Sequence, residues 1–159
     1  VSRKDYDAMS ELMYCGSVSH CGLTELGRMK DFSVHKLGHE LSARCDATHA
    51  MTLTALWGSW ARYVYKYDPA RFAQFGSAIF GVDAGTDEER ARACIRHMEE
   101  FFTEIGMPIS LGGLDIGQLS KGTIEELACA VTANDTIQIG NFHPLTRADV
   151  IAIYEMANH

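Results

Sequence analysis

The feature that most restricts the fold is the stretch of residues 48–67, which has the pattern of one long helix with apolar side chains on most of its sides. The apolar residues recur along the whole stretch: Met51, Leu53, Ala55, Leu56, Trp57, Trp60, Val64 and Tyr65. A helix that is apolar around most of its circumference is a buried one. We therefore expect the other elements to pack around this helix, with Trp57 and Trp60 in the core rather than in a substrate pocket.

The rest of the chain has helical spacing, and it lacks the alternation of apolar and polar residues that predicts a strand. The spacing predicts further helices over residues 3–19, 31–43, 69–80, 86–105, 123–133 and 146–157. Side chains suited to cap free backbone N–H groups stand at the starts of these helices: Asp31, Asp68, Thr86, Thr123 and Thr146. Phe72, Phe75 and Ile79 form the predicted inner face of the helix over residues 69–80. The expected fold is all-α: one bundle-like helical domain over residues 1–159, with roughly six to eight helices.

Charge and composition limit the partners and the compartment. The chain has 159 residues and a net charge of −7 without a basic run, which argues against nucleic acid or an anionic membrane as the main partner. No apolar run approaches the ~20 residues of a membrane span, and the polar start Val1-Ser2-Arg3 does not look like a signal peptide. The five cysteines include no Cys-x-x-Cys pair and fit free thiols. We expect a cytoplasmic protein.

Three histidines stand out by their spacing. His35 and His39 are four residues apart, so they share one face of a helix. Residues 44–48 have the pattern of a turn between two helices, and a helical hairpin would bring His49 back towards the first two. Neutral imidazole is a common ligand of zinc, iron and related divalent metals. The spacing indicates a metal or catalytic site, while polar residues with satisfied hydrogen bonds are the simpler alternative.

The residues around these histidines exclude some versions of the site. A zinc peptidase helix needs Glu directly after the first His or directly before the second, where Lys36 and Gly38 stand. A capping role explains Asp31 without a metal, and packing in a turn explains Cys45 better than a thiolate ligand does. The glycine-rich residues 109–122 lack the spacing of a phosphate-binding loop.

The segment His35-Lys-Leu-Gly-His-Glu-Leu41, with a further His ten residues after His39, resembles the iron-containing (group III) alcohol dehydrogenases. The likeness is to the branch of butanol dehydrogenases and aldehyde reductases. It continues through residues 50–57, Phe101-Phe102, residues 106–108 and residues 140–157. It covers most of the chain from about Asp31 onwards. The three-histidine spacing is its most specific part.

The resemblance implies a dehydroquinate synthase-like helical domain from the C-terminal part of a longer enzyme. Such an enzyme interconverts primary alcohols and aldehydes by metal-assisted hydride transfer with NAD(P), and this branch leans to NADPH. His35 and His49 look like ligands of Fe2+ or Zn2+, and His39 looks like the non-ligand active-site histidine beside the nicotinamide. Asn141 and His143 lie in a tail segment that is similar to a family segment near the active site, although a turn before a helix explains them equally well.

The resemblance also implies partners that these residues do not supply. Family members carry an N-terminal dinucleotide-binding domain and an Asp-x-x-x-His pair that completes the metal site, and they commonly form homodimers. Nothing upstream of Asp31 matches that pair. We therefore expect the 159 residues alone to hold metal weakly and to lack activity.

Two other functions stay open from the sequence. One is a non-catalytic helical module for metal binding or protein interaction. The other is a metal hydrolase, which is the weaker alternative because no general-base carboxylate is clearly placed; Glu40 follows His39 but points to a different face of the helix.

Overall fold

The computed structural model describes residues 4–159, which contain seven α-helices, three short 3-10 helices and no β-strand. The helices are α1 (Tyr6–His20), α2 (Ser33–Cys45), α3 (His49–Val64), α4 (Pro69–Phe80), α5 (Asp87–Glu104), α6 (Lys121–Val131) and α7 (Arg147–Ala157). The predicted all-α fold is confirmed. The predicted start of the first helix at residue 3 lies outside the described residues. No helix in the described part of the chain is both long and apolar enough to cross a membrane.

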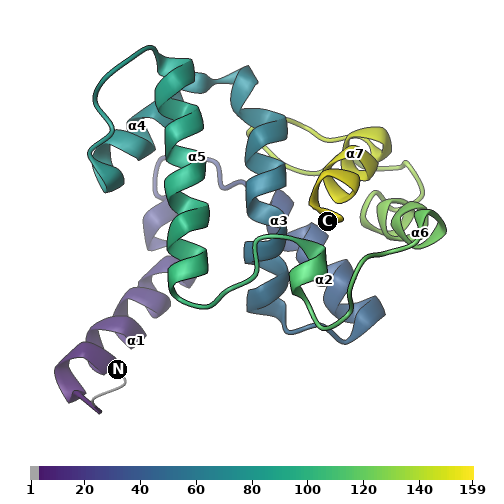
Figure 1. The fold of residues 1–159 in the computed structure, drawn as a ribbon, viewed down its shortest axis with the longest axis horizontal. Coiled ribbons are helices and arrows are strands. Elements are labelled where there is room, and N and C mark those ends of the chain that lie inside the picture. Colours follow the sequence, from purple (N-terminus) through teal and green to yellow (C-terminus); the bar gives the residue numbers. More distant parts are fainter. Residues whose placement is uncertain (1–3) are drawn as a thin grey trace. The chain divides into compact units, whose positions relative to one another are not determined.

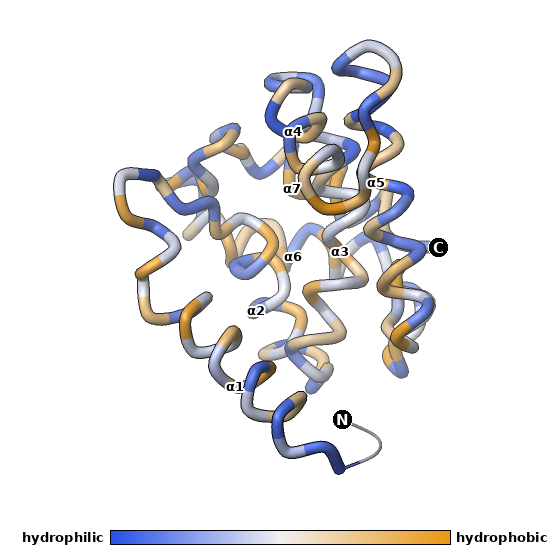
Figure 2. Tube along the Cα trace, turned by 90° about the vertical axis from the view of Figure 1, so that its left-hand side faces the viewer, coloured by the Kyte–Doolittle hydropathy of each residue, from blue (hydrophilic) through white to orange (hydrophobic). Residues whose placement is uncertain are grey.

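The chain divides into two compact units, Val1–Asp31 and Phe32–His159. In the first unit, the Asp5 carboxylate accepts a hydrogen bond from the backbone N–H of Ala8 at 3.1 Å and caps α1. No residue of α1 is buried. Figure 2 shows hydrophobic residues spread along this helix, and among them Leu12 and Met13 are exposed. The first unit therefore has no apolar core of its own around α1.

The second unit packs around α3, as the apolar pattern predicts. Figure 1 shows α3 between α5 on one side and α6 and α7 on the other, and α3 also packs on α2. Ala55, Leu56 and Ala61 on α3 are fully buried. Trp57 and Trp60 are partly buried and pack against this core, so their predicted core role is confirmed.

Three of the predicted helix caps are confirmed. Asp68 accepts from the N–H of Arg71 at 3.2 Å, with Pro69 at the first helical position. Thr86 and Thr146 each form a reciprocal capping box with the acidic residue three positions later. These caps satisfy backbone N–H groups that have no partner inside the helix.

Two predicted caps are wrong. Helix α2 has Phe32 at its N-cap position instead of Asp31, with no capping bond from that side chain. Helix α6 starts earlier than expected, because Ser120 caps it by accepting from the N–H of Thr123 at 3.2 Å. Thr123 therefore lies in the first turn of α6. Two possible capping residues three positions apart explain the error.

The predicted inner face of α4 is also wrong in part. Phe72 is buried, but Phe75 is 36% exposed and Ile79 is 61% exposed. The helix instead turns Gly76 towards α5, and a Cβ atom at Gly76 would lie 2.8 Å from the Cβ of Cys94. Close contact between the two helices, rather than the largest side chains, decides which face of α4 is buried.

A hydrogen bond between α3 and α7 connects the centre of this unit with its last helix. The Tyr63 hydroxyl donates to the Asp149 carboxylate at 2.5 Å. This bond raises the pKa of Tyr63 to about 12. Burial alone would raise the pKa of Asp149, but hydrogen bonds from Thr146 and Tyr63 outweigh it and lower that pKa.

We expect Tyr63→Phe to lower the free energy of unfolding by about 1–2 kcal/mol at neutral pH, because Asp149 loses a charge-assisted partner. The folded-state pKa of Asp149 lies below its ordinary 3.8, so this stabilisation is present above 3.8 and disappears as the pH falls through the folded-state pKa. Urea unfolding at neutral and acidic pH measures both effects. Tyr14→Phe, at a side chain that is 65% exposed, is the control and should leave stability unchanged. An equal loss in both variants would contradict the role of Asp149.

Candidate metal centre

Helix α2 presents two of the three histidines on one face. His35 and His39 are one turn apart, and their ring centroids lie 5.5 Å from each other. The Phe32 ring stacks on the His35 ring at 4.4 Å with an interplanar angle of 26°. Phe32 therefore limits how the His35 ring can turn. The sequence analysis missed this residue, although an aromatic side chain three positions before a helical histidine is a usable signal.

A tight turn returns the chain to this face. Helix α2 ends at Cys45, and Asp46 has a left-handed backbone with φ 53°, a conformation that Asp tolerates better than most residues. Thr48 is the N-cap residue of α3, so His49 is its first residue. The His49 ring lies 4.5 Å from the His39 ring and 5.0 Å from the His35 ring, measured between centroids. The predicted hairpin is confirmed.

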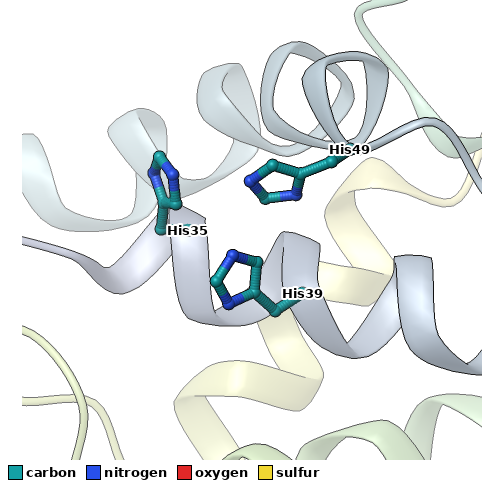
Figure 3. Close-up of side chains that lie close together, drawn as sticks. All are labelled: His35, His39 and His49. Carbon is teal, nitrogen blue, oxygen red and sulfur yellow. The ribbon is translucent and has the colours of Figure 1, made fainter. Parts of the chain in front are cut away.

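The three rings direct nitrogen atoms into the space between them, as Figure 3 shows. One ring nitrogen from each histidine can be chosen so that all three lie within 4.8 Å of one another. Among residues 4–159, this is the one group of three or more His, Cys, Asp or Glu side chains that could hold a metal ion. Asp31 and Cys45 are not in it. The site is thus a set of imidazole nitrogen donors from two helices.

The surroundings of His49 fit a metal ligand. Both of its ring nitrogens are buried, and neither has a hydrogen-bond partner among the described residues. A buried polar atom without a partner costs about 1–3 kcal/mol, so such atoms usually have a ligand, a water or an ion beside them. Burial lowers the pKa of His49, and the nearby charge of His39 lowers it further. A neutral imidazole is the form that binds a metal.

The other two histidines differ from each other in exposure. His39 is exposed, whereas His35 is half-buried beneath Phe32. Zinc and iron both accept imidazole, and three nitrogen donors leave coordination positions for other groups. The arrangement can therefore hold a divalent metal between the less exposed rings while the His39 ring stays in contact with water.

Neither His143 nor His97 belongs to this cluster. His143 stacks on Tyr67 with centroids 3.6 Å apart, just beyond the C-terminal end of α3. His49 is at the opposite end of the 16-residue helix, about 24 Å away at 1.5 Å per residue. His97 is exposed and pairs with Glu100 at 2.9 Å, as expected for a solvated face. His143 therefore cannot reach the three rings.

The glycine-rich residues 109–122 contact His159, the last residue of the sequence, at Gly112. The backbone N–H of Gly112 donates to the carbonyl oxygen of His159 at 3.0 Å. The same carbonyl oxygen would lie 2.3 Å from a Cβ atom at Gly112. The connection therefore packs against the backbone of His159 at Gly112.

We expect the free energy of unfolding of the metal-free protein to decrease as the pH falls below 6.5. The pKa of His49 is lower in the folded protein than its ordinary value of 6.5. The unfolded chain then binds more protons in this range, so the stabilisation is complete above 6.5 and is lost towards the folded-state pKa. Denaturant unfolding across this range measures the slope, and His49→Gln should reduce it.

An NMR titration of the ring protons tests the cause of the shift. His39→Gln removes the charge of His39 and should raise the pKa of His49 only in part, because burial is the larger cause. His97→Gln is the matched control on an exposed histidine. A His49 pKa at or above 6.5 in the wild type would show that its ring is not buried in the way described.

A sequence model of the "Fe-containing alcohol dehydrogenase family, C-terminal" matches residues 1–158. NADH-dependent butanol dehydrogenase A of Clostridium acetobutylicum is 33% identical over 153 residues, which cover 95% of this chain and 39% of that protein. The NADPH-dependent aldehyde reductase of Escherichia coli is 31% identical over 160 residues, covering 97% and 39%.

Solved structures agree with these sequence matches. The crystal structure of NADH-dependent butanol dehydrogenase A from Thermotoga maritima has a TM-score of 0.88 and 26% identity, and the match covers 98% of this chain and 40% of that one. The chain thus spans about two fifths of the length of the relatives that it matches. The family resemblance found in the sequence is confirmed. The chain belongs to the Fe-containing alcohol dehydrogenase family, and it corresponds to the C-terminal part of that family's proteins.

Proposed function

We propose that this chain is the metal-binding helical domain of an oxidoreductase that interconverts alcohols and aldehydes with NAD or NADP. The observation that carries the proposal is the convergence of three imidazoles from α2 and α3, with one nitrogen of each within 4.8 Å of the others. Both nitrogens of His49 are buried and have no hydrogen-bond partner in the part of the chain that the structure describes. The names of its relatives, NADH-dependent butanol dehydrogenase and NADPH-dependent aldehyde reductase, support the reaction class.

His35 and His49 are the proposed metal ligands. Their rings are half-buried, one beneath Phe32 and one at the start of α3. A divalent ion such as Fe2+ or Zn2+ supplies a Lewis acid that polarises a carbonyl oxygen or acidifies an alcohol. Two imidazoles alone give weak binding, because stable sites commonly use three or four ligands. The remaining ligands would come from outside these residues, as the family resemblance implies.

His39 is the proposed proton-transfer residue beside the nicotinamide and the substrate. Its ring is exposed, unlike those of the other two histidines. An imidazole titrates near neutral pH and can exchange protons with bulk water. The position of His39 next to two ligands would hold its ring near an oxygen atom of the substrate. Hydride transfer itself needs the nicotinamide, whose binding domain belongs to the rest of the proposed enzyme.

The remaining parts of the proposal follow the family and concern the whole enzyme. They are an N-terminal dinucleotide-binding domain, a small alcohol or aldehyde as substrate, a homodimeric assembly and a cytoplasmic location. Support for a longer enzyme comes from the relatives, of which the matched part is 39% of the whole.

We expect His35→Ala and His49→Ala to weaken the binding of Co2+ to the chain by more than about tenfold, and His39→Ala to change it less than about twofold. Titration with Co2+, followed by its visible absorption, measures the affinity. His97→Ala, which removes an exposed histidine elsewhere on the second unit, is the control. Stoichiometric iron or zinc that resists a chelator in the isolated chain, or equal losses in all three cluster variants, would contradict the two-ligand assignment.

In the intact enzyme, His39→Ala should lower kcat by about 100-fold or more while the metal content stays constant, because proton transfer loses its residue. The assay is oxidation of NADPH or NADH in the presence of butanal, together with metal analysis of each variant. Absence of turnover with wild-type, metal-loaded enzyme would instead favour the non-catalytic metal-binding module. Metal-dependent hydrolysis of an ester or an amide would favour the hydrolase.

A further inference from the structure

Two buried hydroxyl groups bond to consecutive backbone carbonyls in the middle of α2. The Tyr154 hydroxyl of α7 donates to the carbonyl oxygen of Leu37 at 2.9 Å. The Thr52 hydroxyl of α3 lies 3.2 Å from the carbonyl oxygen of Gly38. Both side chains are fully buried. These carbonyls lie between His35 and His39, so the two hydroxyls hold the part of α2 that carries the histidine pair.

Thr52 also connects to the third histidine. Its hydroxyl lies 2.8 Å from the carbonyl oxygen of His49, one turn earlier on α3. The hydroxyl has a single hydrogen, which the carbonyls of Gly38 and His49 share. One side chain therefore contacts both backbone segments from which the imidazoles project.

The two helices approach each other most tightly at this point. A Cβ atom at Gly38 would lie 2.8 Å from Thr52 Oγ1 and 3.0 Å from Leu53 Cδ2. Any side chain at position 38 would push α2 away from α3. The absence of a side chain at Gly38 thus lets the two helices approach closely enough for the Thr52 hydroxyl to reach the α2 backbone.

Tyr154 is suited to a permanent bond. Burial raises its pKa well above the ordinary value, so the hydroxyl keeps its proton and remains a donor at neutral pH. Nothing about this contact depends on the imidazoles themselves. It fixes α2 from the side of α7, whereas Thr52 fixes α2 from the side of α3.

We propose that Thr52 and Tyr154 are positioning residues for the metal centre: they set the place of α2 relative to α3 so that the His35 and His49 imidazoles converge on one ion with the His39 ring beside them. This inference rests on the proposed function. A metal needs its nitrogen ligands about 2.0–2.1 Å from the ion, and a site tolerates displacements of only about 0.5 Å. A helix that lost either hydroxyl contact would move the pair His35 and His39 relative to His49.

A purely structural role has a different signature. Loss of a buried hydrogen bond lowers the free energy of unfolding wherever the bond is located. It changes metal affinity only if the bond controls the distance between the ligands. Metal affinity under conditions in which every variant is fully folded therefore separates positioning from general stability.

The test uses Thr52→Val and Tyr154→Phe, each of which removes a hydroxyl with little change of shape. Thr54→Val is the matched control for the first, because the Thr54 hydroxyl donates to Met51 of its own helix at 3.1 Å. Tyr63→Phe is the control for Tyr154→Phe. Tyr63 lies at the end of α3 opposite His49, and its hydroxyl bonds to Asp149 of α7. Thr52→Ser keeps the hydroxyl and should restore binding.

Titration with Co2+ gives the main result. We expect Thr52→Val and Tyr154→Phe each to weaken Co2+ binding about tenfold and to alter its visible absorption, while Thr52→Ser and both controls stay within about twofold of wild type. Wild-type affinity in Thr52→Val or Tyr154→Phe would overturn the role of that residue. Equal weakening in a variant and its control would show a loss of stability only.

A second measurement needs no metal. The His39 and His49 rings are 4.5 Å apart between centroids, close enough for a nuclear Overhauser effect between their ring protons. We expect that signal to weaken in Thr52→Val and Tyr154→Phe but not in the controls. If the wild-type chain bound Co2+ too weakly to titrate, this ring-to-ring signal would still decide whether the two hydroxyls position the histidines. An unchanged signal would overturn the inference.

Discussion

The close packing of α2 on α3 is the contact on which the candidate site depends. It brings Gly38 against Thr52, with no room for a side chain at position 38. Apolar burial drives the two helices together, since Leu37 and Leu41 on α2 and Leu56 on α3 are fully buried. Burial alone is not directional, and helices held only by it could slide past each other. The steric contact and the buried hydroxyls add a defined position along the helix axes.

The electrostatics of the three imidazoles favour a metal over protons. Two or three protonated rings at centroid distances of 4.5–5.5 Å would repel one another with little screening where the rings are buried. The lowered pKa of His49 is the result of burial and of that repulsion. One divalent ion, in contrast, replaces several mutual repulsions by attractions to the same centre. The buried His49 ring is therefore better suited to bind a metal than a proton.

Much of the fold and of this site could be predicted from the sequence because it depends on residues that are close together in the chain. The spacing of His35 and His39, the turn before His49 and the caps at Thr86 and Thr146 involve residues a few positions apart. The contact between Tyr154 and the Leu37 carbonyl joins residues 117 positions apart, and no local pattern signals it. The rotation of α4 around Gly76 was missed for the same reason, since it depends on the position of α5. The separate roles proposed for His35 and His39 could not be derived from spacing, because identical side chains on one helix face differ only in their surroundings.

The short turn between α2 and α3 has a consequence for how the length of the chain can vary. Surface turns usually tolerate gain or loss of residues. An added residue among Asp46, Ala47 and Thr48 could bulge into solvent and leave both helices in place. A deletion cannot be accommodated in the same way, because the shorter chain must unwind the end of α2 or the start of α3. The first residue of α3 is His49 itself. This exposed turn should therefore tolerate an inserted residue but not a deleted one.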